Sequence, residues 1–159
     1  MKEKKVYSNL INQLKEEAGQ LFLVIDPPNQ SPEQAAKMSK IAEEAGAKAI
    51  AVGGSLGAQG KSLDDTLIAI KDKCAIPTIL FPGNIATLSN IADAVYFMSM
   101  LNSNDPYYIS GAQVASSFPI KKMDLEVIPT SYIIVEPGRA VGFMGRAQLI
   151  PRNLPYLAA

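Results

Sequence analysis

The chain has 159 residues, and its 15 basic residues balance its 15 acidic residues. This balance leaves no global field to attract nucleic acid, so no nucleic-acid partner is expected. No histidine is present, which excludes Ser-His-Asp and Cys-His catalysis and histidine-ligated zinc sites within this chain. The single cysteine, with no apolar stretch of transmembrane length and no signal segment, predicts a cytoplasmic protein.

The chain alternates between amphipathic segments with helical spacing and continuous apolar runs. Helical spacing of apolar residues over 7–18, closed by Gly19, predicts a first helix. Continuous apolar runs, which are typical of strands buried on both faces of a parallel sheet, follow at residues 21–25, 49–52, 78–81, 94–98 and 132–135.

Helices are predicted between these strands. Ser31 is a helix N-cap, and Met38 and Ile41 belong to the predicted buried stripe of that helix. A second helix is predicted to start at Ser62 and another to cover 107–116. Strands alternating with helices predict an α/β fold with a parallel sheet.

Polar residues follow three of the strands, and Asp26, Ser55 and Asn84 are 29 residues apart each time. The carboxyl ends of parallel strands form the mouth where such folds bind ligands. Asp26 is a candidate ligand for a divalent cation, with Ser55 as a second oxygen ligand. Gly53 and Gly54 are candidates for a phosphate-binding loop. The structural alternatives are that Asp26 caps its turn and that the glycines serve backbone geometry alone.

Aromatic residues near the fourth strand have two interpretations. Phe97, Tyr107 and Tyr108 are candidates for lining a channel for a long apolar ligand. Their periodicity alone favours the other interpretation, in which they fill the core.

Several segments of the sequence resemble those of a known protein family. IDPPNQ, VGGSLGAQG, PTILFPGN, DAVYFMSMLNSNDPYYISGAQ, EVIPTSYIIVEPG and GRAQLIPRNLP occur in order between residues 20 and 155. They closely resemble the geranylgeranylglyceryl phosphate synthase family, which includes bacterial heptaprenylglyceryl phosphate synthases. The resemblance implies a parallel (β/α)8 TIM barrel with about five of the eight βα units present, so that residues 1–159 form a single incomplete barrel domain.

The resemblance also implies an activity. Members of the family use Mg²⁺ to transfer a geranylgeranyl group from geranylgeranyl diphosphate to the 3-hydroxyl of sn-glycerol 1-phosphate, in archaeal ether-lipid biosynthesis. Asp26 and Ser55 match the magnesium ligands of the family, whereas Pro28 and Asn29 stand where an acid and a lysine are usual.

Other parts of the family pattern have no counterpart. The Tyr-Leu-Glu-Ala-Gly-Ser-Gly strand end that binds glycerol phosphate does not occur, so no glycerol phosphate-binding residue is assigned in this chain. No catalytic residue is assigned either. The alternative function is a catalytically inert half-barrel fragment or truncated gene product that acts only through association. An incomplete parallel sheet exposes an apolar edge, which predicts a homo-oligomer.

Overall fold

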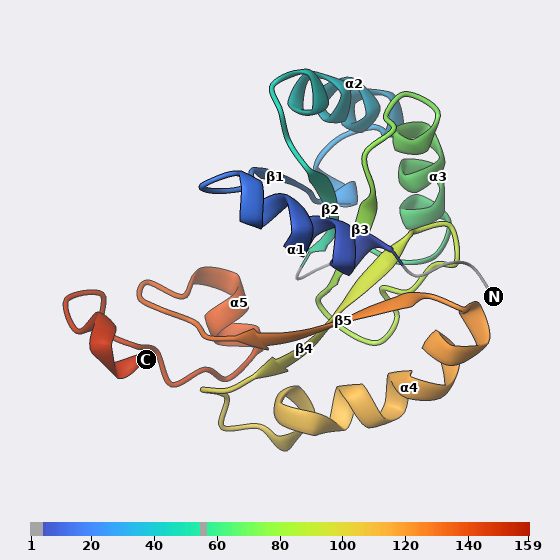
Figure 1. Cartoon of the computed structure of the whole chain (residues 1–159). Coiled ribbons are helices and arrows are strands. Elements are labelled where there is room, and N and C mark those ends of the chain that lie inside the picture. The colour runs from blue at the N-terminus through green and yellow to red at the C-terminus, as the bar shows by residue number, and fades with distance from the viewer. Residues whose placement is uncertain (1–4, 55–56) are drawn as a thin grey trace. The chain divides into compact units, whose positions relative to one another are not determined.

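The computed structural model of the chain describes residues 5–54 and 57–159. Contacts divide the chain into two compact units, Met1–Tyr96 with Pro119–Ile128 and Phe97–Phe118 with Pro129–Ala159. The elements, labelled in Figure 1, are α1 (Val6–Glu16), β1 (Phe22–Ile25), η1 (Pro27–Asn29), α2 (Pro32–Glu44), β2 (Ala49–Gly54), α3 (Gly60–Lys71), β3 (Thr78–Pro82), β4 (Ala94–Met100), η2 (Tyr107–Gly111), α4 (Ala112–Met123), β5 (Glu126–Tyr132), α5 (Arg139–Met144) and η3 (Pro155–Leu157).

The strands form one five-stranded sheet in the order β1-β2-β3-β4-β5. Strands β1 to β4 pair in parallel, and the register aligns Ile25 with Val52, Val52 with Leu80, and Leu80 with Val95. Residues paired in this way share one face of the sheet, and all four side chains are at most 1% exposed. Helices α2 and α3 lie side by side against the first three strands (Figure 1). The predicted parallel α/β architecture is therefore confirmed.

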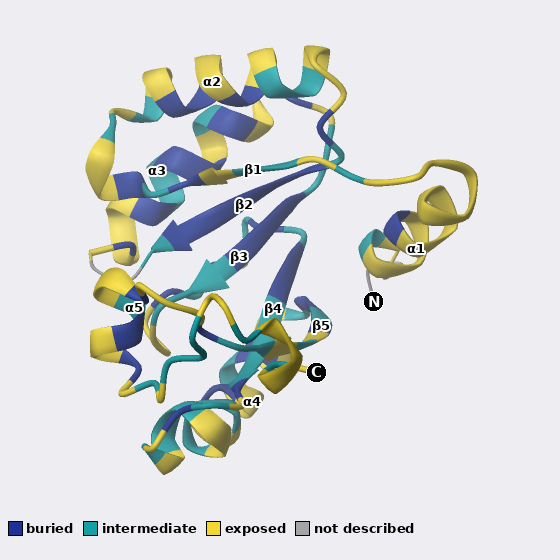
Figure 2. Ribbon diagram, turned by 90° about the vertical axis from the view of Figure 1, so that its left-hand side faces the viewer, coloured by how far each residue is buried: buried dark blue, intermediate teal, exposed yellow. Residues whose placement is uncertain are grey.

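The opposite face of the sheet in the first unit has small residues at its centre. Ala49, Ile79 and Ala94 form a buried cluster there with Ile128 of β5, and Leu10 of α1 packs into it. Leu10 is the one residue of α1 that is buried, and the rest of that helix is largely exposed in Figure 2. The predicted first helix is confirmed, but it contacts the sheet through a narrow stripe. Its predicted end at Gly19 is wrong, because the helix ends at Glu16 and Gly19 does not have a positive φ.

The predicted buried stripe of α2 is wrong. Met38 and Ile41 are 39% and 57% exposed, and the buried residues of the helix are Ala35, Ala36 and Ser39. Small side chains allow α2 to approach β1 and α3 closely. The helix therefore packs through these small residues rather than through its larger apolar residues. The predicted Ser31 N-cap is confirmed, because its hydroxyl oxygen accepts a hydrogen bond from the Gln34 backbone N–H at 3.3 Å.

Three predicted boundaries also differ. Helix α3 begins at Gly60, two residues before Ser62, and the helix predicted over 107–116 is a π-helical turn that continues as α4 to Met123. The last strand is Glu126–Tyr132 rather than 132–135. Pro129 lies inside this strand, and a proline normally marks the end of a strand in a sequence. An edge strand such as β5 tolerates proline, because the missing N–H is not needed for pairing. Within the described part of the chain, no helix is long and apolar enough to cross a membrane.

Candidate metal and phosphate site

Asp26 lies directly after β1 and organises the turn that follows. Its backbone carbonyl accepts hydrogen bonds from the Asn29 N–H at 2.9 Å and from the Gln30 side-chain amide at 2.6 Å. The Asn29 side-chain amide donates to Asp26 Oδ2 at 3.4 Å. Asn29, which stands where the family usually has lysine, therefore still places a hydrogen-bond donor beside this carboxylate.

The other carboxylate oxygen of Asp26 faces the end of β2. A Cβ added to Gly54 would lie 2.7 Å from Asp26 Oδ1, and Gly54 has a φ of +153°. Both observations favour glycine here, because any larger residue would collide with the carboxylate and would strain the backbone. Asp26 thus lies against the residue that precedes Ser55. Ser55 itself lies outside the described residues, and its role as a metal ligand stays a prediction.

Gly53 brings β2 and β3 close together at the same end of the sheet. A Cβ at Gly53 would lie 1.9 Å from the backbone oxygen of Phe81, a distance that no real side chain permits. Backbone geometry therefore requires glycine at this position. Its role in phosphate binding, like that of Gly54, stays a prediction.

Asn84 follows β3 and belongs to its own turn. Its side-chain oxygen accepts a hydrogen bond from the Ala86 N–H at 2.8 Å, and its backbone carbonyl accepts one from the Thr87 N–H at 3.1 Å. This is an Asx turn. Contact of Asn84 with a phosphate stays a prediction.

Asp26 supplies one carboxylate at the end of β1. Among residues 5–54 and 57–159, no three His, Cys, Asp or Glu side chains gather where they could share a metal ion. Mg²⁺ is commonly held by one or two carboxylates, with water and substrate phosphates completing its octahedron. Magnesium binding at Asp26 stays a prediction.

Aromatic side chains lie in both units. In the first, Phe81 of β3 and Tyr96 of β4 meet edge to face, with ring centroids 5.7 Å apart, and burial raises the pKa of Tyr96 above its ordinary value. Tyr96 was missed by sequence reasoning. Side chains alternate between the two faces along a strand. Because Leu80 pairs with Val95, the next residues, Phe81 and Tyr96, lie together on the other face of the sheet.

In the second unit, Tyr107 and Tyr108 also meet edge to face, with centroids 5.0 Å apart. Phe97 is half-buried in β4. Contact of these three predicted channel residues with an apolar ligand stays a prediction.

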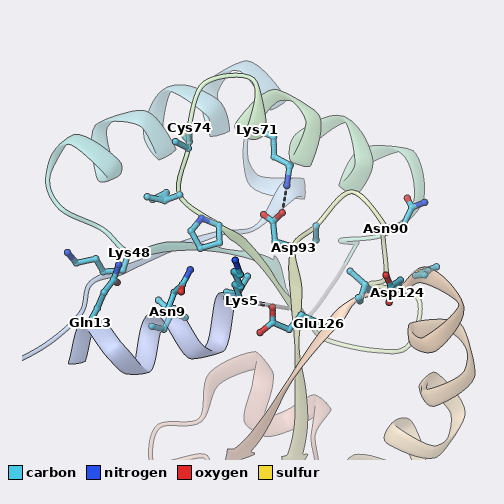
Figure 3. Close-up of a pocket in the computed structure, with 18 residues that line it drawn as sticks. Lys5, Asn9, Gln13, Lys48, Lys71, Cys74, Asn90, Asp93, Asp124 and Glu126 are labelled. Carbon is cyan, nitrogen blue, oxygen red and sulfur yellow. Dashed lines mark hydrogen bonds and ion pairs between the residues drawn. The ribbon is translucent and has the colours of Figure 1, made fainter. Parts of the chain in front are cut away.

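A separate cavity of about 360 Å³ (Figure 3) lies at the amino ends of the strands, since Lys48, Pro77 and Asp93 in its lining directly precede β2, β3 and β4. Polar side chains of α1, including Asn9 and Gln13, line one side. Across it Lys71 forms an ion pair with Asp93. Burial by itself raises the pKa of Asp93, but hydrogen bonds from Lys71 and from the Thr78 N–H outweigh burial and hold the pKa below its ordinary value. In barrel folds this end serves stability rather than chemistry.

Comparison with known proteins decides the family. Residues 12–159 match the PcrB family. The chain belongs to this family. The PcrB-family chain is 51% identical over 138 residues to the geranylgeranylglyceryl phosphate synthase of Pyrococcus horikoshii, a match that covers 87% of this chain and 54% of the relative. It is 50% identical over 150 residues to that of Methanococcoides burtonii, which covers 94% of this chain and 61% of the relative.

Solved structures agree with the PcrB-family assignment. The wild-type GGGPS from Thermoplasma volcanium superposes with a TM-score of 0.83 at 41% identity, covering 86% of this chain and 55% of that one. The (S)-3-O-geranylgeranylglyceryl phosphate synthase from Thermoplasma acidophilum, in complex with its substrate sn-glycerol-1-phosphate, superposes with a TM-score of 0.83 at 39% identity, covering 88% of this chain and 57% of that one. The chain spans a little over half the length of these proteins. Its five strands are consistent with part of the (β/α)8 barrel of the family, although the described residues between β3 and β4 form no helix.

Proposed function

We propose that this PcrB-family chain provides the diphosphate-binding part of a prenyltransferase. The reaction is transfer of a geranylgeranyl group from geranylgeranyl diphosphate to the 3-hydroxyl of sn-glycerol 1-phosphate, in ether-lipid biosynthesis. The observation that carries the proposal is the family match over residues 12–159, in which Asp26 lies at the mouth of the sheet against Gly54.

Asp26 and Ser55 would hold Mg²⁺ in this proposal. When bound, the ion neutralises charge on the diphosphate leaving group. The residues of the chain have distinct tasks around it. Asn29 donates a hydrogen bond that orients the Asp26 carboxylate, and Gly54 leaves the space beside Oδ1 open. Gly53 and Asn84 are the proposed contacts for the phosphate oxygens.

The proposed prenyl-binding residues are Phe97, Tyr107 and Tyr108, all in the second unit, where the rings of Tyr107 and Tyr108 meet edge to face. Burial of a prenyl chain contributes roughly 25 cal/mol per Å² of apolar surface removed from water. The length of the prenyl group follows from how far this surface extends.

The acceptor is assigned to the part of the family fold beyond this chain. The Thermoplasma acidophilum relative binds sn-glycerol-1-phosphate, and the glycine-containing strand end that the family uses for this ligand has no counterpart in the present sequence. The proposed compartment is the cytosol, where the buried thiol of Cys74, the single cysteine of the chain, stays reduced. Self-association of the isolated chain also stays a prediction.

Ligand titration of the purified chain tests the proposal. We expect magnesium-dependent binding of geranylgeranyl diphosphate, followed by calorimetry, and a loss of about tenfold in affinity for Asp26→Asn, which corresponds to about 1.4 kcal/mol. Asp72→Asn is the control, because Asp72 is an exposed carboxylate at the end of α3. Equal affinity of the chain and of Asp26→Asn at limiting Mg²⁺ would remove Asp26 from the metal site.

A further inference from the structure

We propose that the cavity between α1 and the amino ends of the strands binds a small uncharged molecule with several hydroxyl groups, of about the size of a monosaccharide. The described residues that line this cavity, called the α1 cavity below, all belong to the first unit. Its volume of about 360 Å³ lies within the range of roughly 300–1,000 Å³ that is usual for small-molecule sites. Because it lies at the amino ends of the strands, the proposal does not rest on the proposed prenyltransferase activity at Asp26.

The charges around the α1 cavity cancel. Lys71 Nζ lies 2.5 Å from the carboxylate of Asp93, and Lys48 Nζ lies 2.8 Å from that of Glu17. The charged residues of the lining are three lysines and three acids, namely Lys5, Lys48, Lys71, Asp93, Asp124 and Glu126. With equal numbers of both signs, the lining has no net charge to attract an anion or a cation.

The carboxylates of Asp93 and Glu126 already have hydrogen-bond donors. One oxygen of Asp93 accepts from Lys71, and the other accepts from the Thr78 N–H at 2.9 Å. The two oxygens of Glu126 accept from the backbone N–H groups of Val6 and Tyr7 at 2.9 and 2.8 Å. A ligand ammonium group would therefore have to displace a donor that the protein itself supplies.

The side-chain amides of Asn9 and Asn90 are different. Both residues line the α1 cavity, and neither amide makes a hydrogen bond to any residue that the structure describes. The Asn9 side chain extends from α1 toward the cavity, and the Lys71–Asp93 ion pair lies across from it (Figure 3). An amide offers N–H donors and a carbonyl acceptor, and a hydroxyl group can bond to both. Unpaired amides in a neutral site therefore favour a polyhydroxylated ligand.

Apolar side chains supply another part of the lining. Leu10 of α1 and Leu125 are buried, and Ile76 and Pro77, directly before β3, are half-buried. The C–H groups of a sugar ring can pack against such side chains while its hydroxyl groups face the amides. The mixed lining therefore fits a ligand that has both kinds of surface.

A ligand in the α1 cavity would join α1 to the ends of the strands. Leu10 is the one buried residue of α1. A ligand that contacts Asn9 on one side and the Lys71–Asp93 pair on the other adds contacts that exist only while the helix is docked. We therefore expect the ligand to slow hydrogen exchange of the α1 amides about tenfold when its free concentration is ten times Kd.

Nuclear magnetic resonance of the full chain tests the proposal. Glucose and mannose are titrated separately, and the side-chain amide signals of Asn9 and Asn90 are followed. We expect saturable shifts of these signals with both sugars. Asn9→Ala should weaken the binding about fivefold, which is the effect of one lost hydrogen bond.

Asn12→Ala is the matched control and should leave the affinity unchanged. Asn12 also lies on α1, but its side-chain oxygen accepts a hydrogen bond from Lys15 at 3.2 Å, and neither residue lines the cavity. Inorganic phosphate is the charged probe, and Asp26→Asn should bind both sugars as the unaltered chain does. The proposal would be overturned if neither sugar gave saturable shifts, if Asn9→Ala and Asn12→Ala bound the sugars equally, or if phosphate alone shifted the two amide signals. Loss of sugar binding in Asp26→Asn would also overturn it, because the sugar would then lie at the carboxyl ends of the strands.

Discussion

At the scale of single residues, two observations favour glycine at position 54. Its φ is +153°, and a Cβ there would lie 2.7 Å from Asp26 Oδ1. We expect Gly54→Ala to lower the free energy of unfolding by about 1–3 kcal/mol. The displaced carboxylate should also weaken magnesium-dependent binding of geranylgeranyl diphosphate.

The matched control is Gly19→Ala, because nothing lies within 4 Å of a Cβ built at Gly19. Its effect should stay within about 0.5 kcal/mol. Urea unfolding followed by circular dichroism measures both variants, and calorimetry measures the ligand. If Gly54→Ala matches Gly19→Ala in stability and keeps full affinity, then Asp26 does not depend on the space beside Gly54.

At the scale of elements, α1 is held by a residue from the other end of the chain. The buried carboxylate of Glu126, at the start of β5, accepts hydrogen bonds from the backbone N–H groups of Val6 and Tyr7 at 2.9 and 2.8 Å. These N–H groups have no partner within the helix, and the N-cap residue Lys5 supplies no side-chain cap. Glu126 therefore caps a helix that buries only Leu10.

We expect Glu126→Ala to cost about 1–2 kcal/mol of stability. Because the lost hydrogen bonds are local to the first turn, hydrogen exchange should accelerate most in the amides of α1. Glu44→Ala, at an exposed position at the end of α2, is the control. Uniform acceleration across the sheet would show that Glu126 supports the core rather than the helix.

A second element-scale contact predicts a pH dependence. Asp93 precedes β4 and accepts hydrogen bonds from Lys71 and Thr78, which together hold its pKa below the ordinary value in spite of burial. A lowered folded-state pKa means that its stabilisation is complete well above the unfolded value of about 3.9 and is lost as the pH falls through the folded value.

The stability difference between the chain and Asp93→Asn should therefore be constant from about pH 7 to pH 5 and shrink below about pH 4. Urea midpoints across this range measure it, with Asp72→Asn as the exposed control. A difference that grows as the pH falls would mean that the pKa of Asp93 is raised rather than lowered.

At the scale of the whole molecule, the proposed function assigns the chain one part of a two-substrate site. The reaction needs an acceptor hydroxyl held in line with the prenyl carbon, and such positioning can supply several kcal/mol of barrier reduction. The acceptor-binding strand end of the family has no counterpart in this sequence. We therefore expect no transfer of radiolabelled prenyl groups to sn-glycerol 1-phosphate by the chain alone. Robust magnesium-dependent product would show that the acceptor site lies within these residues.

Local patterns were enough to predict the alternation of strands and helices, the Ser31 cap and the position of Asp26 directly after a strand. Each depends on neighbours within a few residues, and apolar runs and caps act at that range. The predicted burial of that strand on both faces is wrong, because Val24 of β1 is 50% exposed. The resemblance of whole segments predicted the family, which residues 12–159 confirm.

Contacts between residues far apart in the sequence determined the features that local patterns did not predict. The buried face of α2 contains Ala35 and Ala36 rather than the predicted Met38 and Ile41. Close packing of α2 against β1 and α3 depends on side-chain size and not on hydrophobicity alone. The capping of α1 by Glu126 joins residues 120 positions apart, and the clearance at Gly54 depends on a carboxylate from another strand. No pattern along the chain carries such information, because it arises only when the strands lie side by side.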